Sequence, residues 1–383
     1  MDYIKLCDVC DFQGGSQPPK DEWSFIPKDG YIRMLQIRDF TQGERVIPEY
    51  IKLTNTTKIC EADDILIARY GASLGKTLTG LSGAYNVAIM RTIPNTELLE
   101  KKYLYYYLKA PAFQCFLLKI GNRAAQAGFN KNDLQELLIP CVSREQQEEV
   151  VCILEKVDTL ICARKQQLQK LDELVKARFV EMFGDPVQNP FGWSTRPLLE
   201  MGYCKNGMNF HTGDSGIEMH CLGVGDFKDY SVIDGTEHLP MISLNEAPPE
   251  ESMLQDGDIV FVRSNGNKAL VGRCLVVYPR NTPTTYSGFC IRYRLTNAEV
   301  NIAYLLRVLK TESMRKKMAG RGANIQNLNQ QILATLHIPI PPFELQNQFA
   351  AFVEQVDKSK VAVQKALDEA QLLFDSLMQK YFG

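Results

Sequence analysis

Apolar side chains recur at alternating steps of four and three residues in two stretches of the chain, residues 150–182 and 349–381. Neither stretch contains Gly or Pro, and each runs into a Phe-Gly pair. Because this spacing keeps apolar side chains on one helix face over about four heptads, the pattern predicts two coiled-coil helices. The apolar seam positions are Val150, Leu154, Val157, Ile161, Leu168, Leu171, Val175, Phe349, Val353, Val356, Val363, Leu367, Phe374 and Leu377.

Three cationic residues, Arg164, Arg178 and Lys360, interrupt the seams. They leave an alternative open, in which two amphipathic helices pack on separate cores. The end of the first helix is marked by Gly184, since glycine favours the position just past a helix and Pro186 soon follows.

The two halves of the chain are copies of one unit. From about residue 121 onward they align at a constant offset of 199 residues, so that Ile139-Pro140 matches Ile338-Pro339 and Phe183-Gly184 matches Phe382-Gly383. Upstream the offset drifts, which indicates loops of different length. Each copy is therefore predicted to contain a variable globular part followed by a rigid helix.

Two tandem copies that each end in such a helix favour antiparallel pairing of the helices about a pseudo-two-fold axis. A helix of about 38 residues is roughly 57 Å long, and the globular parts would lie at its two ends. Strand-like runs occur in both globular parts, and helical patterns follow them. The strand-like runs are residues 65–69, 87–90, 259–263 and 275–278, and the helical patterns are residues 103–119 and 302–318.

The expected fold class is therefore α+β, with two tandem globular domains of mainly β structure separated by a long antiparallel two-helix coiled coil. The predicted segments are residues 1–143 and 185–342 for the globular domains and residues 144–184 and 343–383 for the helices.

The composition fits a folded protein, because 45% of the 383 residues are hydrophobic and 23% are charged. No apolar run is long enough to predict a membrane span, and no signal peptide is evident at the N-terminus. The 11 cysteines are expected to be free thiols in a reducing cytoplasm. The net charge of −2 is no global sign of nucleic-acid binding.

Motifs for catalysis are weak or incomplete. Residues 71–77 resemble a phosphate-binding loop but have three residues between the glycines where that loop needs four. Cys7 and Cys10 form a CxxC pair without a second pair to complete a zinc site. Residues 189–192 lack the second proline of an amino-methyltransferase loop, which favours a turn. The chain is therefore predicted to be non-catalytic on its own, with neither a metal nor a cofactor.

Basic residues gather at equivalent places in the two copies. Residues 306–321 carry six cationic side chains and one acid, and residues 119–131 carry three cations and no acid. Amide side chains lie among them, and Arg, Lys, Asn and Gln are the residues that contact phosphates and base edges. This pattern suits DNA, although a run of charges is more often a solvated helix face.

Several segments, in order and partly duplicated, resemble the specificity subunits of type I restriction–modification systems over the whole chain. In the second copy an I-P-x-P-P-x-x-x-Q pattern precedes the long helix, whereas residues 139–143 of the first copy depart from it. The matching segments are Gly14–Pro18, Asp64–Leu66 with Gly71–Lys76, Asp258–Gly266, Phe183–Trp193 and Ile338–Gln346.

The resemblance implies two target recognition domains that each contact one half of a bipartite, asymmetric site in double-stranded DNA. The paired helices would set the gap between the half-sites and dock two modification subunits. Those methyltransferase subunits would bind S-adenosylmethionine and methylate adenine, and a motor-endonuclease restriction subunit would use ATP and Mg.

Polar loop residues beside the matched motifs are the candidates for contact with DNA. They are Arg69, Tyr70, Ser73, Lys76, Asn86 and Arg123 in the first domain, and Arg263, Ser264, Asn265, Asn267, Lys268, Arg321 and Asn324 in the second. Two alternatives remain: a self-contained nucleotide-dependent nucleic-acid enzyme, and a coiled-coil scaffold that binds no DNA.

Overall fold

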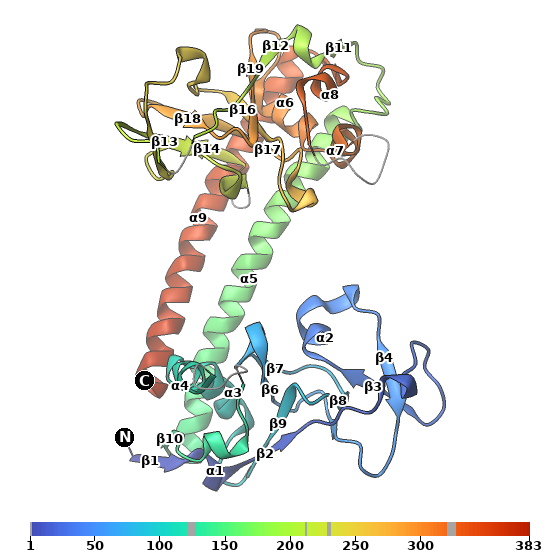
Figure 1. The fold of residues 1–383 in the computed structure, drawn as a ribbon, viewed down its shortest axis with the longest axis vertical. Coiled ribbons are helices and arrows are strands. Elements are labelled where there is room, and N and C mark those ends of the chain that lie inside the picture. The colour runs from blue at the N-terminus through green and yellow to red at the C-terminus, as the bar shows by residue number, and fades with distance from the viewer. Residues whose placement is uncertain (1, 122–127, 211–212, 228–230, 320–326) are drawn as a thin grey trace. The chain divides into compact units, whose positions relative to one another are not determined.

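The structure of the chain is a computed structural model, which describes residues 2–121, 128–210, 213–227, 231–319 and 327–383 (Figure 1). The chain divides into two compact units. Unit 1 comprises residues 1–166 and 364–383, and unit 2 comprises residues 167–363. Each unit therefore combines the globular part of one copy with segments of both long helices. Within the described part of the chain, no helix combines the length and apolar character that crossing a membrane requires.

Unit 1 is built on two four-stranded sheets and a small strand pair. The first sheet has the order β2 (Cys10–Gly14), β9 (Ile89–Pro94), β6 (Leu66–Ala68) and β7 (Thr77–Leu78). The second has the order β4 (Glu49–Lys52), β3 (Tyr31–Leu35), β8 (Gly83–Tyr85) and β5 (Ile59–Cys60). The pair is β1 (Asp2–Lys5) with β10 (Leu138–Cys141), and the shorter helices are α1 (Leu6–Val9), α2 (Ile37–Gln42), α3 (Lys101–Lys109) and α4 (Pro111–Gly121).

Unit 2 repeats this plan. Its larger sheet has the order β12 (Gly202–Asn206), β19 (Cys290–Leu295), β16 (Asp258–Val262), β17 (Cys274–Tyr278) and β14 (Val232–Asp234). Its smaller sheet has the order β15 (Met241–Leu244), β13 (Ile217–Leu222) and β18 (Thr284–Tyr286). The strand pair is β11 (Thr195–Pro197) with β20 (His337–Pro339), and the shorter helices are α6 (Ile302–Leu309), α7 (Glu312–Ala319) and α8 (Gln330–Ala334).

The matching strand orders confirm the duplication that the sequence predicts. The order β2–β9–β6–β7 of unit 1 corresponds to β12–β19–β16–β17 of unit 2, and in both units the third strand pairs antiparallel with its neighbours. All five residues of β16 are buried, which explains why this strand is an almost continuous apolar run and not an alternating one.

Two helical expectations are wrong in detail. The pattern over residues 103–119 is two helices, because Pro111 lacks the amide hydrogen that a continuous helix needs at that position. The pattern over residues 302–318 is likewise broken, and Lys310 ends α6. The strand expected over residues 87–90 begins only at Ile89, since Val87 and Ala88 form a turn.

The long helices α5 (Arg144–Phe183) and α9 (Phe343–Phe382) have 40 residues each and begin at equivalent positions of the repeat. In unit 1 Leu154 of α5 and Phe374 of α9 belong to one apolar core, and in unit 2 Val175 and Phe349 do. All the apolar seam positions that the sequence predicts are buried or partly buried.

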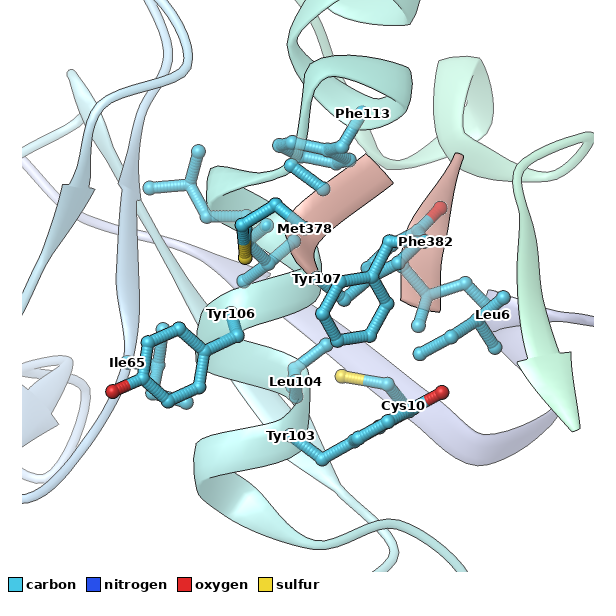
Figure 2. Packing of buried hydrophobic residues seen from close by; sticks show 14 of the residues in the cluster. Leu6, Cys10, Ile65, Tyr103, Leu104, Tyr106, Tyr107, Phe113, Met378 and Phe382 are labelled. Carbon is cyan, nitrogen blue, oxygen red and sulfur yellow. The ribbon is translucent and has the colours of Figure 1, made fainter. Parts of the chain in front are cut away.

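Toward the C-terminal end of each long helix the buried positions shift to steps of four. Phe179 and Phe183 are buried in α5, and Met378 and Phe382 in α9. The shift occurs because these ends pack against a helix of the globular part. In unit 1, α9 contacts α3 and Phe113 of α4 lies nearby (Figure 2).

A matched aromatic pair joins each helix end to the globular part of the other copy. The ring centroids of Tyr103 and Phe382 are 5.0 Å apart in unit 1, and those of Tyr304 and Phe183 are 4.8 Å apart in unit 2. The tyrosine hydroxyls donate to the equivalent carbonyls of Pro140 and Pro339. The two copies therefore exchange their helix ends reciprocally.

A buried glutamine also recurs at equivalent positions. Gln346 is fully buried, accepts a hydrogen bond from the Asn301 amide at 2.9 Å, and donates to the carbonyls of Glu299 and Pro341. Gln147 makes the corresponding bonds in unit 1, beginning with the Glu100 amide at 2.7 Å. The start of α9 and the start of α5 are thus held in the same way, although the preceding loop sequence differs.

Candidate nucleic-acid interface

An ion pair anchors the strand that carries the predicted loop in each unit. In unit 1 the buried carboxylate of Asp64 is 2.8 Å from Arg91 Nε and accepts the Glu61 amide. In unit 2 the buried carboxylate of Asp258 accepts two hydrogen bonds from Arg294, both 2.8 Å long. The pairing with Asp258 raises the pKa of Arg294, so that this guanidinium stays charged. The acidic residue of the Asp-Ile-Leu segment is therefore a structural anchor.

Arg69 extends from the end of β6 and ties three segments of unit 1 together. Its backbone amide donates to the Ala88 carbonyl at 2.8 Å. Its guanidinium donates to the carbonyls of Phe129 at 3.1 Å and Val87 at 3.2 Å, and it lies over the Tyr70 ring. Because those bonds hold the side chain against the backbone, Arg69 fixes the surface on which Tyr70 stands exposed.

Arg263 has the same place in unit 2. Its amide donates to the Phe289 carbonyl at 2.8 Å, and its guanidinium donates a long hydrogen bond of 3.4 Å to the Gly288 carbonyl. The Leu328 amide donates to the Arg263 carbonyl at 2.7 Å. Ser264 forms an isolated bridge with Asn327, as Tyr70 does with Gly128 in unit 1. The same three segments therefore meet in both units.

The turn after each arginine places further predicted residues. Lys76 is exposed and Ser73 is partly buried, beside Gly75 at a φ of +80°. In unit 2 Asn267 caps a short 3-10 turn through the Ala269 amide at 3.1 Å. Asn265 accepts the Asn267 amide at 2.8 Å, and Lys268 is exposed. The side-chain oxygen of each asparagine thus accepts a hydrogen bond within the turn, while its side-chain nitrogen carries two hydrogens that it can donate.

The turn between β8 and β9 completes the surface in unit 1. Asn86 accepts the Ala88 amide at 3.2 Å and is partly buried. A Cβ on Gly15 would lie 2.1 Å from the Asn86 carbonyl oxygen, and one on Gly207 would lie equally close to the Ser287 carbonyl oxygen in unit 2. Glycine is therefore required where the early Gly-rich segment passes this turn.

Three predicted contacts, Arg123, Arg321 and Asn324, lie outside the described residues. Gly128 and Asn327, the first described residues after those two gaps, bridge to Tyr70 and Ser264. A Cβ on Gly128 would lie 2.4 Å from the Tyr70 ring, so only glycine allows this approach. Lys131 nearby is paired with Asp11, and this hydrogen bond raises the pKa of Lys131.

Two exposed apolar residues, one in this turn of each unit, were not identified from the sequence. Phe289 is 61% exposed in unit 2, and Val87 is 42% exposed at the matching turn of unit 1. The Val87 carbonyl accepts a hydrogen bond from the Arg69 guanidinium, and the Phe289 carbonyl accepts one from the Arg263 backbone amide. An apolar residue directly after Asn86 or Gly288 was the one signal available, and it equally suits the start of a strand.

Among the residues that the structure describes, no group of three or more His, Cys, Asp or Glu side chains is placed to hold a metal ion. The surface instead offers hydrogen-bond donors, cations and exposed rings on two matching loop sets. Such groups can bind phosphates, stack on bases and contact base edges.

Comparison with known proteins agrees with this arrangement. The family model described as the type I restriction modification DNA specificity domain matches residues 1–173 and 246–370. The MjaVIII specificity subunit of Methanocaldococcus jannaschii is 21% identical over 88% of this chain and 84% of its own length. The StySPI specificity subunit of Salmonella potsdam is 23% identical over 93% of this chain and 82% of its own.

Solved structures share the fold. A chain from work on complex assembly and conformational transition of the type I R-M system has a TM-score of 0.59 and 19% identity, with coverage of 100% of this chain and 97% of that chain. The type I S subunit from M. genitalium has a TM-score of 0.54 and 15% identity, with coverage of 100% and 96%. The chain therefore belongs to the family of type I restriction–modification DNA specificity subunits.

Proposed function

We propose that each globular part is a target recognition domain that contacts one half of a bipartite, asymmetric site in double-stranded DNA. The observation that carries this function is the pair of matched loop sets, at β6 with residues 128–129 and at β16 with residues 327–328. The scaffolds match while the side chains that they carry differ, Tyr70 against Ser264 and Ala88 against the exposed Phe289. Unlike side chains on like scaffolds suit two half-sites of different sequence.

The long helices are proposed to fold back on each other as an antiparallel coiled coil with pseudo-two-fold symmetry. The reciprocal aromatic pairs and the matched glutamines Gln147 and Gln346 support this arrangement, because each copy is completed by the helix end of the other. A rigid pair of helices would set the gap between the half-sites, as the spacing of two domains does in dimeric repressors.

Exposed leucines on the long helices support docking of two modification subunits. Leu174 of α5 is 47% exposed and Leu373 of α9 is 50% exposed, and the two occupy equivalent positions of the repeat. Each exposed leucine offers an apolar contact to a partner, and the equivalent positions suit two copies of one partner. The relative from the assembly study named above is described as part of a type I R-M system.

The chain is proposed to act without catalysis or a cofactor of its own. Adenine methylation with S-adenosylmethionine would reside in the modification subunits, and ATP- and Mg-dependent cleavage in the restriction subunit. The turn at residues 71–73 lies beside Arg69 in the loop surface, which gives the Gly-rich segment a role in placing the DNA contacts.

Selection of binding sites from random duplex DNA by the chain with its modification subunits tests this function. We expect two short specified segments separated by a fixed run of unspecified bases. Because Arg69 and Arg263 hold the two loop surfaces in place, replacing Arg69 by Ala should relax one specified segment alone, and replacing Arg263 by Ala the other alone, at about 1–3 kcal/mol per affected base pair. Lys156→Ala, on the exposed face of α5, is the matched control. A single uninterrupted site, or equal effects of both variants on both segments, would refute the proposal.

A further inference from the structure

A set of basic hollows lies in unit 2 beside the junction of α6 and α7. Three adjoining hollows share Lys176 of α5, Arg307 of α6 and Lys310, which directly follows α6, and the largest of the three has a volume of about 610 Å³. Six cationic side chains and two acidic ones line that largest hollow. The cations are Lys176, Lys268, Arg307, Lys310, Arg315 and Lys316.

The acidic side chains around these hollows already have partners. Glu312 pairs with Lys316 at 2.6 Å, and Asp172 pairs with Lys360 at 2.7 Å. The Asp185 carboxylate accepts the amides of Val187 and Gln188. The acidic side chains around the hollows therefore make their direct contacts with other groups, although the charge of Asp172 still acts on Arg307 and Lys310.

Two of the shared cations have no ion-pair partner within 4 Å among the described residues. The side chains of Lys176 and Arg307 form no hydrogen bond or ion pair with any other residue that the structure describes. The charge of Asp172 acts on Arg307 only from beyond ion-pair distance. Arg307 Nε is buried without a hydrogen-bond partner in the described chain. Lys310 donates to the Ser231 hydroxyl at 2.6 Å, which supplies no charge. Burial lowers the pKa of both Arg307 and Lys310.

The shared fold does not require these cations. The repeat places Tyr106 and Lys109 of α3 where unit 2 has Arg307 and Lys310, and Asp375 of α9 where it has Lys176. The Lys109 ammonium lies 4.9 Å from the centroid of the Tyr105 ring and 5.8 Å from that of Phe374, so aromatic faces solvate it. Unit 1 thus has one neutral, one basic and one acidic side chain at the three positions where unit 2 has three cations.

We propose that the hollow formed by Lys176, Arg307 and Lys310 binds a phosphate group, and that this site belongs to unit 2 alone. A phosphate would give these three cations the direct ionic partner that the described residues do not provide, and a guanidinium with two ammonium groups suits its several oxygens. The phosphate could come from the DNA backbone or from a free polyphosphate such as that of a nucleotide. The DNA source rests on the proposed function, whereas the anion site itself does not.

Thermal unfolding of the full chain with inorganic tripolyphosphate, against sodium chloride at equal ionic strength, tests the site. Arg307→Gln and Lys176→Gln are the variants, and Lys170→Gln removes one exposed charge from the same helix as the control. We expect tripolyphosphate to stabilise the unaltered chain and the control, and each site variant to bind it at least tenfold more weakly. Lys176 is exposed, so its variant keeps the core intact.

The salt dependence of binding to duplex DNA of unrelated sequence distinguishes the two sources. Loss of one backbone contact should lower the slope of log K against log salt by about one in the site variants. A changed slope assigns the site to DNA, and an unchanged slope with lost tripolyphosphate binding assigns it to a free ligand. Identical tripolyphosphate response and identical slope in all four proteins would overturn the site. Failure of the bipartite DNA selection would leave the tripolyphosphate result standing.

Discussion

Replacing Gln346 by Ala should destabilise unit 2 strongly for so small a change. The side chain is fully buried and makes three hydrogen bonds, to the Asn301 amide and to the carbonyls of Glu299 and Pro341. At about 1 kcal/mol for each lost bond, the loss in the free energy of unfolding is about 3 kcal/mol. With an m value of about 2–3 kcal/mol/M, the urea midpoint should fall by about 1–1.5 M.

Circular dichroism during urea unfolding measures this change. Gln348→Ala is the matched control, because Gln348 is exposed two residues away on the same helix, and it should stay within about 0.5 kcal/mol of the unaltered chain. Gln346→Glu should be worse than Ala, because a carboxylate would face two carbonyl oxygens. If Gln346→Ala were as stable as the control, the matched glutamines could not be what holds the start of each long helix.

Three further changes address the helices. Phe183→Ala and Phe382→Ala should each lower the free energy of unfolding, measured by urea titration, by about 3–5 kcal/mol. Phe191→Ala, at an exposed site, is the control and should lower it by less than about 1 kcal/mol. Equal losses in all three variants would contradict the exchange of helix ends. Leu174→Glu and Leu373→Glu should each remove one modification subunit from the assembly without changing the melting temperature, as native mass spectrometry would show; an assembly that keeps both subunits would exclude these leucines. Inserting one heptad after Gln166 and one after Val363 adds about 10 Å of helix, which should lengthen the unspecified gap by about three base pairs; an unchanged gap would mean that the helices do not set it.

The long helices could be predicted from the sequence because a heptad pattern depends on local geometry alone. Their bounds, including the end of α5 before Gly184 at a φ of +70°, follow from positions close together in the chain. The shift to Phe179 and Phe183 could not be predicted in this way. It depends on Tyr304, which lies more than one hundred residues away and becomes a neighbour only through the fold.

The sequence predicted where along the chain the loop sets lie, but not which way their side chains point. Arg69 and Arg263 were expected at the DNA, and the structure turns their side chains toward carbonyls of Val87 and Gly288. Those carbonyls belong to a turn about 20 residues onward, whose approach is set by sheet pairing. The exposed rings that stand beside the arginines, such as Phe289, depend on the same pairing.

Mapping methylated adenines across the genome of the source cell, with and without this gene, tests the central claim most directly. The account predicts methylation at one asymmetric motif of two specified parts with a constant gap, all of it lost when the gene is removed. A motif that is continuous, or methylation that persists without the gene, would contradict the account.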